Sequence, residues 1–184
     1  MELIADEIKL RQDAVAYQVV NKLKDILKDT NSFLYYNFPL YRGDVPDDII
    51  QAKLLLASPA IGVVYFAILS ENRQLNDVEK QYLENLDAHI FQRFIKRSEL
   101  RINKRSLKFS VSAIVISENV YDDNDYIYVK LSNLKKALAD LKQEELRQDE
   151  FNILLGCIEG TAKMVTKKDR IVSEERKPTK KETF

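Results

Sequence analysis

Two short apolar segments on either side of Ser58 and Pro59 stand out in the pattern of hydrophobic and polar positions. The first, Ile50 to Leu56, lies between Asp48 and Ser58, and the second, Ile61 to Leu69, is almost wholly apolar. Short apolar runs framed by turn-forming residues are typical of buried strands. We therefore predict two strands here, joined by a hairpin connection that makes them antiparallel neighbours.

The rest of the chain changes between helical and strand-like periodicity. Helical spacing of apolar residues predicts helices over 13–29, with Asp13 as the N-cap, over 75–103, over 132–147 and from 149 onwards. Aromatic or alternating patterns predict further strands over 33–40, 107–117 and 126–129. The first 12 residues are a strand or an irregular lead-in.

This order of elements predicts the fold class. A helix, three strands, a long helix and a further strand make an α/β fold with a mixed central sheet flanked by helices. A chain of 184 residues that is 45% hydrophobic can bury one core. We predict one domain over 1–165 and a flexible linker over 166–184, where Lys, Arg, Glu and Thr replace the apolar residues.

Composition narrows the classes of function. Lys and Arg together number 29, as do Asp and Glu, so an electrostatic function has to be local. A single cysteine, Cys157, and a single histidine, His89, exclude an internal disulfide and disfavour a zinc site. No apolar run reaches the roughly 20 residues of a membrane span, and the start lacks a signal-peptide core. These features predict a cytoplasmic protein without a membrane partner.

The apolar segments also resemble a known family. The resemblance lies in the aromatic strand that ends at Pro39 and Leu40, in LLLASP and GVVYF, in the long helix and in the strand LKFSVSAIVIS. Over roughly residues 12–120 these resemble the nuclease-related N-terminal domain of bacterial superfamily 1 DNA helicases. The resemblance implies a restriction-endonuclease-like PD-(D/E)XK core and a role in DNA repair or in defence against foreign DNA.

The resemblance further implies a helicase motor domain in the same parent chain, because the tail ERKPTKKETF is similar to the linker into such a motor. This sequence contains no G-x-x-x-x-G-K-[ST] phosphate loop. ATP binding and hydrolysis would therefore belong to the motor of the parent protein and not to these 184 residues.

Nucleases of this fold carry an Asp at the start of the second core strand and Glu-x-Lys along the third, which together bind and use Mg²⁺. Here Gln51 and Ala52 stand at the first position, and the residues over 65–69 include no acid. We therefore predict no catalytic residue, no metal site and no cofactor. The expected function is a catalytically degenerate accessory domain that positions DNA or a partner protein.

Two alternatives remain open. In the first, the domain is an active Mg²⁺-dependent nuclease in a shifted register, with Asp48 (or its neighbour Asp47) and Glu71 as metal ligands and Arg73 in place of the lysine. In the second, it is a protein-interaction domain without DNA contact.

A run of cations surrounds the end of the long predicted helix. Its members are Arg93, Lys96, Arg97, Arg101, Lys104, Arg105 and Lys108. If the helix continues, several of them project to one side, because successive residues rotate by about 100°. The run is then a candidate phosphate-binding strip. Alternatively, these cations complement the dipole at the helix end.

Overall fold

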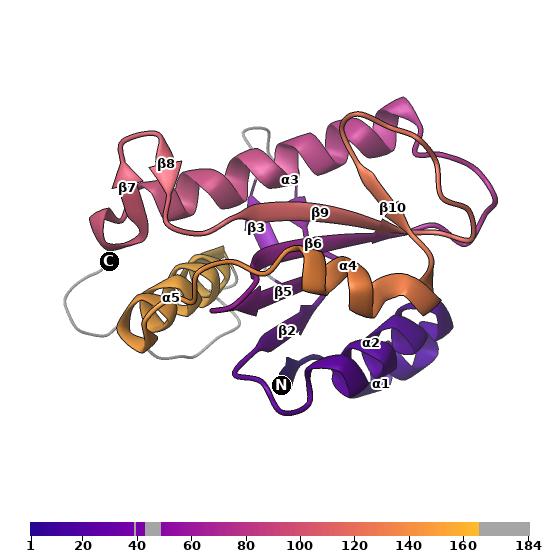
Figure 1. The fold of residues 1–184 in the computed structure, drawn as a ribbon, viewed down its shortest axis with the longest axis horizontal. Coiled ribbons are helices and arrows are strands. Elements are labelled where there is room, and N and C mark those ends of the chain that lie inside the picture. The colour runs from indigo at the N-terminus through magenta and orange to yellow at the C-terminus, as the bar shows by residue number, and fades with distance from the viewer. Residues whose placement is uncertain (39, 43–48, 166–184) are drawn as a thin grey trace.

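Side chains alternate along the central strands and so distribute the apolar residues between two cores, one on each face of a mixed six-stranded sheet (Figure 1). The computed structural model describes residues 1–38, 40–42 and 49–165. The strand order is β1 (Glu2–Ile4), β2 (Phe33–Tyr36), β5 (Leu54–Ser58), β6 (Gly62–Ile68), β9 (Val111–Ile116) and β10 (Ile127–Val129).

The middle of the sheet has the predicted connectivity. Strands β2, β5 and β6 form an antiparallel meander, in which Leu56 pairs with Leu34 on one side and Val64 on the other. The hairpin predicted at Ser58 and Pro59 is thereby confirmed. Strand β9 lies parallel to β6, β10 lies parallel to β9, and β1 adds to β2 in parallel.

Helices cover both faces of the sheet. Helices α1 (Glu7–Gln12), α2 (Ala14–Leu27) and α4 (Leu134–Asp140) pack on one face, and α3 (Asp77–Ile95) and α5 (Gln148–Val165) pack on the other. The predicted fold class, an α/β fold with a mixed sheet flanked by helices, is confirmed. The predicted N-cap is also correct, since the Asp13 side chain accepts a hydrogen bond from the Ala16 backbone N–H.

The alternation of β5 and β6 sets the identity of the two cores. Leu55 and Tyr65 point to the side of α3 and α5, whereas Leu56 and Phe66 point to the side of α2 and α4. All of these side chains are at most 5% exposed, so this hairpin contributes to both cores. Burial on both faces explains why its sequence is an almost continuous apolar run.

The predicted strand over 50–56 is wrong in its boundaries. The chain leaves the sheet at Asn37, whose φ of 52° is left-handed and ends β2. Strands β3 (Leu40–Arg42) and β4 (Ile49–Gln51) then form a separate antiparallel pair, and β5 begins only at Leu54. The Asn37 N–H donates to the Lys53 carbonyl at 2.9 Å, so the chain rejoins the sheet at Lys53, directly before β5.

The long predicted helix over 75–103 is wrong at its C-terminal end. Helix α3 ends at Ile95, and a 3-10 turn (Ser98–Leu100) follows it and buries Leu100. Strands β7 (Arg101–Asn103) and β8 (Ser106–Leu107) then form a small antiparallel hairpin (Figure 1). Consequently the main-sheet strand predicted from 107 starts at Val111.

Two further boundaries differ from the prediction. The helix predicted over 132–147 covers only Leu134–Asp140, with Asn133 at its N-cap position. The first 12 residues contain the short helix α1 as well as strand β1, because the Asp6 side chain caps the backbone N–H groups of Ile8 and Lys9. The predicted linker over 166–184 lies outside the described residues.

Candidate nucleic-acid interface

The seven predicted cations do not lie along one continuous helix, because α3 ends among them. Arg93 lies in the last turn of α3, and Lys96 is its C-cap. The remaining five follow the 3-10 turn and the β7–β8 hairpin. They are Arg97 before the turn, Arg101 on β7, Lys104 and Arg105 between the strands, and Lys108 after β8.

Three of the seven cations hold the local structure together. Arg97 donates to the Glu99 carboxylate at 3.1 Å, and Arg101 donates to the Ile95 carbonyl at 3.0 Å. Lys108 donates to the Glu150 carboxylate of α5 at 2.7 Å. This contact with Lys108 is the largest cause of a pKa of Glu150 below its usual range. Their charges are therefore engaged within the protein.

Lys96, Lys104 and Arg105 differ from these three. They are exposed, as Arg97 and Lys108 also are, but no carboxylate among the residues that the structure describes pairs with any of them. Arg93 is half-buried, and its charge acts on the thiol of Cys157 in α5. The candidate interface therefore consists of Lys96, Lys104 and Arg105, and Arg97, Arg101 and Lys108 stabilise the segment that carries it.

The charge of the chain is strongly segregated. Residues 93–108 contain seven of the 29 basic residues and one of the 29 acidic residues, Glu99. This leaves 22 basic and 28 acidic residues for the rest of the chain, which is net negative by the same six charges by which 93–108 is net positive. Residues 93–108 are thus a positive segment of an electrically neutral chain, where an anionic partner would be attracted.

The β7–β8 hairpin that carries this charge is well anchored. The Asn103 side chain accepts a hydrogen bond from the Arg105 N–H at 2.8 Å and fixes the turn between the strands. Behind the turn, the Lys108 N–H donates to the Leu100 carbonyl at 2.9 Å. Figure 1 shows the hairpin at one end of the molecule, beyond the C-terminal end of α3.

Sequence reasoning did not single out Ile102, an exposed large apolar residue of the hairpin. Its side chain is 70% exposed on β7, between Arg101 and Asn103. Its apolar character fitted the helical spacing of the preceding residues and therefore did not point to a hairpin. The available signal was Asn103, a turn-former followed by two cations.

The positions expected for nuclease carboxylates border a cleft of about 440 Å³ between the start of β5, the end of β6 and α3. Lys53 just before β5, Ala67 on β6 and Leu69 just after β6 line it, and Glu79 of α3 is its acidic residue. Both charged side chains have partners elsewhere. Lys53 pairs with Asp13 at 2.6 Å, and Glu79 pairs with Arg73 at 2.7 Å.

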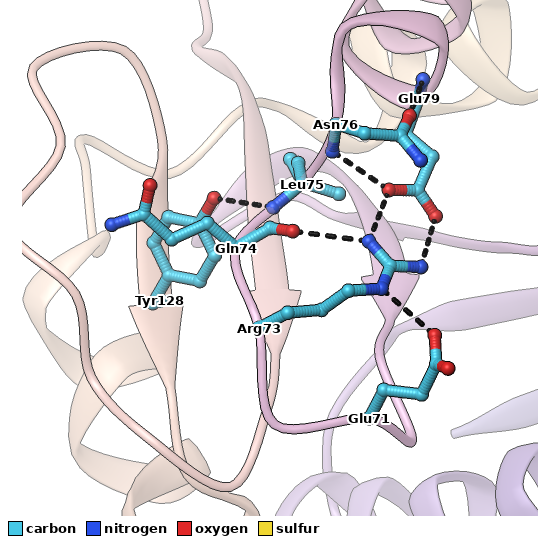
Figure 2. Close-up of polar contacts among 7 residues, drawn as sticks. All are labelled: Glu71, Arg73, Gln74, Leu75, Asn76, Glu79 and Tyr128. Atoms are coloured by element: carbon cyan, nitrogen blue, oxygen red, sulfur yellow. Dashed lines mark hydrogen bonds and ion pairs between the residues drawn. The ribbon is translucent and has the colours of Figure 1, made fainter.

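Glu71 and Arg73, the residues of the alternative nuclease site, build the loop that leads into α3 (Figure 2). The Arg73 guanidinium donates through Nε to Glu71 at 2.8 Å, and through Nη1 to the Gln74 carbonyl at 3.0 Å. Its two Nη atoms also bind both oxygens of Glu79, at 2.7 and 3.0 Å. Bidentate Arg–carboxylate pairs of this kind are geometrically specific.

Glu79 connects this loop to the start of α3. Its carboxylate accepts the Asn76 N–H at 2.9 Å, while the Asn76 side chain accepts the Glu79 N–H at 2.8 Å, which completes a capping box. The hydrogen bond from Arg73 is the largest cause of a lowered pKa of Glu79. The arrangement fixes the direction in which the chain enters α3. The two carboxylates, of Glu71 and Glu79, bind the Arg73 guanidinium.

The remaining acids of the alternative site do not complete a metal centre in the described part of the chain. Asp47 and Asp48 lie outside the described residues. Within 1–38, 40–42 and 49–165, no group of three or more His, Cys, Asp or Glu side chains could hold a metal ion. In the same ranges no helix is both long and apolar enough to cross a membrane.

No family model, curated protein or solved structure matches this chain.

Proposed function

We propose that this chain is a non-catalytic accessory domain that contacts nucleic acid through its basic hairpin, defined as β7, β8 and the turn between them (residues 101–107). The observation that carries this proposal is the charge of Lys96, Lys104 and Arg105. They are exposed and have no carboxylate partner among the described residues, and they lie in 93–108, a segment with seven basic residues and one acidic residue. Phosphate groups are the natural partners of such a surface.

The connectivity of the sheet supports a restriction-endonuclease-like core for this domain. The order α2, β2, β5, β6, α3 and β9, with three antiparallel strands and a fourth strand parallel to the third, is the order expected for that core. Attachment to the motor of an ATP-driven DNA helicase is the biological context that the resemblance implies. The domain would then position DNA for that motor.

The side chains at the expected catalytic positions support the absence of nuclease activity. The third core strand, β6, places Tyr65 and Ala67 on the side of α3, and Leu69 follows directly after the strand; none of these side chains can bind a hard cation as a carboxylate does. Glu71 and Glu79 are both occupied by Arg73. A nuclease would have to break both ion pairs with Arg73 before these carboxylates could bind a metal ion.

Binding of fluorescently labelled duplex DNA over a series of salt concentrations tests the proposal. If three cations contact phosphates, the logarithm of the affinity should fall with the logarithm of salt with a slope of about −2.7. Lys104→Glu combined with Arg105→Glu should weaken binding and flatten that slope by about two. The matched control reverses Lys130 and Lys135, which are exposed beside α4 and without a carboxylate partner among the described residues.

Three outcomes would contradict the proposal. Absence of salt-dependent binding would favour the protein-interaction alternative. Equal losses in the hairpin variant and in the control variant would show that binding is not local. Cleavage of DNA that requires Mg²⁺ or Mn²⁺ and disappears in Asp48→Asn or Glu71→Gln would establish the nuclease alternative.

A further inference from the structure

The basic hairpin presents an apolar side chain between its cations. Ile102 is 70% exposed on β7, at the irregularity where the register of β7 and β8 shifts between Arg101 and Asn103. Leu107, the cross-strand partner of Arg101, packs against the main core. The exposure of Ile102 shows that its side chain projects into solvent, and Lys104 and Arg105 follow it within about 10 Å of chain.

We propose that the basic hairpin inserts Ile102 between adjacent bases of duplex DNA while Lys104 and Arg105 hold the flanking phosphates. This inference rests on the proposed function and specifies how the bound DNA is deformed. Exposed aliphatic side chains beside cations are the residues that proteins use as wedges, and unstacking a base step costs a few kcal/mol. Direct contact of the apolar side chain with the bases offsets part of that cost.

A wedge has to be rigid, because a mobile support would yield before the bases separate. Four contacts hold this hairpin in place. They are Arg105 N–H to Asn103 Oδ1 (2.8 Å), Lys108 N–H to the Leu100 carbonyl (2.9 Å), Arg101 to the Ile95 carbonyl (3.0 Å) and Lys108 to Glu150 (2.7 Å). They connect the hairpin to α3, to the 3-10 turn and to α5, so force at Ile102 is transmitted to the core.

The charges around Ile102 favour DNA over a protein partner with an apolar surface. No carboxylate among the described residues neutralises Lys104 or Arg105, and docking the hairpin against an apolar protein surface would remove both cations from water without a partner. Phosphates on either side of a base step satisfy the cations while the apolar side chain is between the bases. One ligand therefore meets both requirements.

Duplex DNA that contains a single 2-aminopurine tests the inference, because this base becomes more fluorescent when it is unstacked. At saturating protein, the wild type should raise the fluorescence at least about twofold at one or more positions of the base. Ile102→Ser should abolish the rise without changing the salt slope of binding, since no charge is altered. Ile102→Leu should retain the rise.

The control variant is Val78→Ser. Val78 is 79% exposed on α3, so this change removes an equally exposed aliphatic side chain that is not on the basic hairpin. It should leave the fluorescence rise intact. Salt-dependent binding without a rise in the wild type, or a rise that persists in Ile102→Ser, would refute the wedge and leave the proposed function standing. Absence of any DNA binding would refute both.

Discussion

Gly62 offers the sharpest test of the strand arrangement, because its conformation and its surroundings both exclude a side chain. It follows the hairpin connection between β5 and β6 and has a left-handed φ of 96°. A Cβ atom built on Gly62 would lie 2.4 Å from the Ser110 carbonyl oxygen and 3.2 Å from Oε1 of Gln143. The Ser110 carbonyl is not free to move, since it accepts the Val63 N–H at 2.9 Å.

Gly62→Ala should therefore be strongly destabilising. The left-handed conformation costs about 1–2 kcal/mol for a residue with a Cβ. Displacing the Ser110 carbonyl, where β6 first meets β9, adds about 1–3 kcal/mol as an overpacking cost. The expected loss of about 2–5 kcal/mol is a large part of the 5–15 kcal/mol typical of a domain.

Urea unfolding followed by far-ultraviolet circular dichroism measures this loss of unfolding free energy. The chain contains no tryptophan, so tryptophan fluorescence cannot serve as the probe. The matched control is Gly156→Ala in α5, where an added Cβ meets nothing within 4 Å. That change should stabilise the protein by about 0.5–1 kcal/mol, because alanine favours the helix. A Gly62→Ala variant within about 0.5 kcal/mol of the wild type would refute the close contact of β6 with Ser110.

Three other measurements address the buried side chains of Glu150 and Tyr65 and the half-buried thiol of Cys157. Lys108 holds the pKa of Glu150 below its usual value of 4.5, so the stabilisation lost in Glu150→Gln should be complete above that pH and shrink as pH falls below it. A difference in unfolding free energy that does not vary with pH would contradict this linkage. Burial raises the pKa of Cys157 to about 11, and at pH about 8 the native thiol should react with Ellman's reagent about 100-fold more slowly than the unfolded chain. Equal rates would show an accessible thiol. Tyr65→Phe removes a 2.8 Å hydrogen bond to Asp87 and should cost about 1 kcal/mol in urea unfolding; an unchanged midpoint would show that the bond contributes nothing.

The sheet could be predicted from the sequence because its signals are local. Ser58 and Pro59 separate two apolar runs, and alternation across such a short connection leaves little choice but an antiparallel pair. The long helix after β6 then has to return the chain to the same edge of the hairpin before β9 begins, which makes β9 parallel to β6. The hairpin depends on residues close together in the chain, whereas the pairing of β6 with β9 joins residues 48 positions apart and follows from the helix that connects them.

The end of α3 could not be predicted in the same way. Leu100 and Ile102 continue an apolar spacing compatible with a helix, yet the first is buried in a 3-10 turn and the second is exposed on β7. What decides between these outcomes is the packing of Leu100 in the core that α3 shares with α5. Contacts of that kind join segments about 50 residues apart and leave no periodic signal in the sequence.

The candidate site shows the same division. The concentration of cations over 93–108 is visible in the sequence, but which of them are neutralised is decided by Glu150, 42 residues beyond Lys108. Folding engages Arg97, Arg101 and Lys108 and leaves Lys96, Lys104 and Arg105 exposed. The sequence therefore located the positive segment but could not separate the cations that brace it from those that face a partner.

The charge of residues 93–108 is costly unless it is used. Cations this close repel one another, and the remainder of the chain has an excess of six acidic residues that could have neutralised them. Glu99 pairs with Arg97 and Glu150 pairs with Lys108, whereas no carboxylate among the described residues pairs with Lys104 or Arg105 in the turn. A fold selected for stability alone would distribute these charges evenly. Their concentration at the end of α3 and on the anchored hairpin therefore favours an anionic ligand that neutralises them.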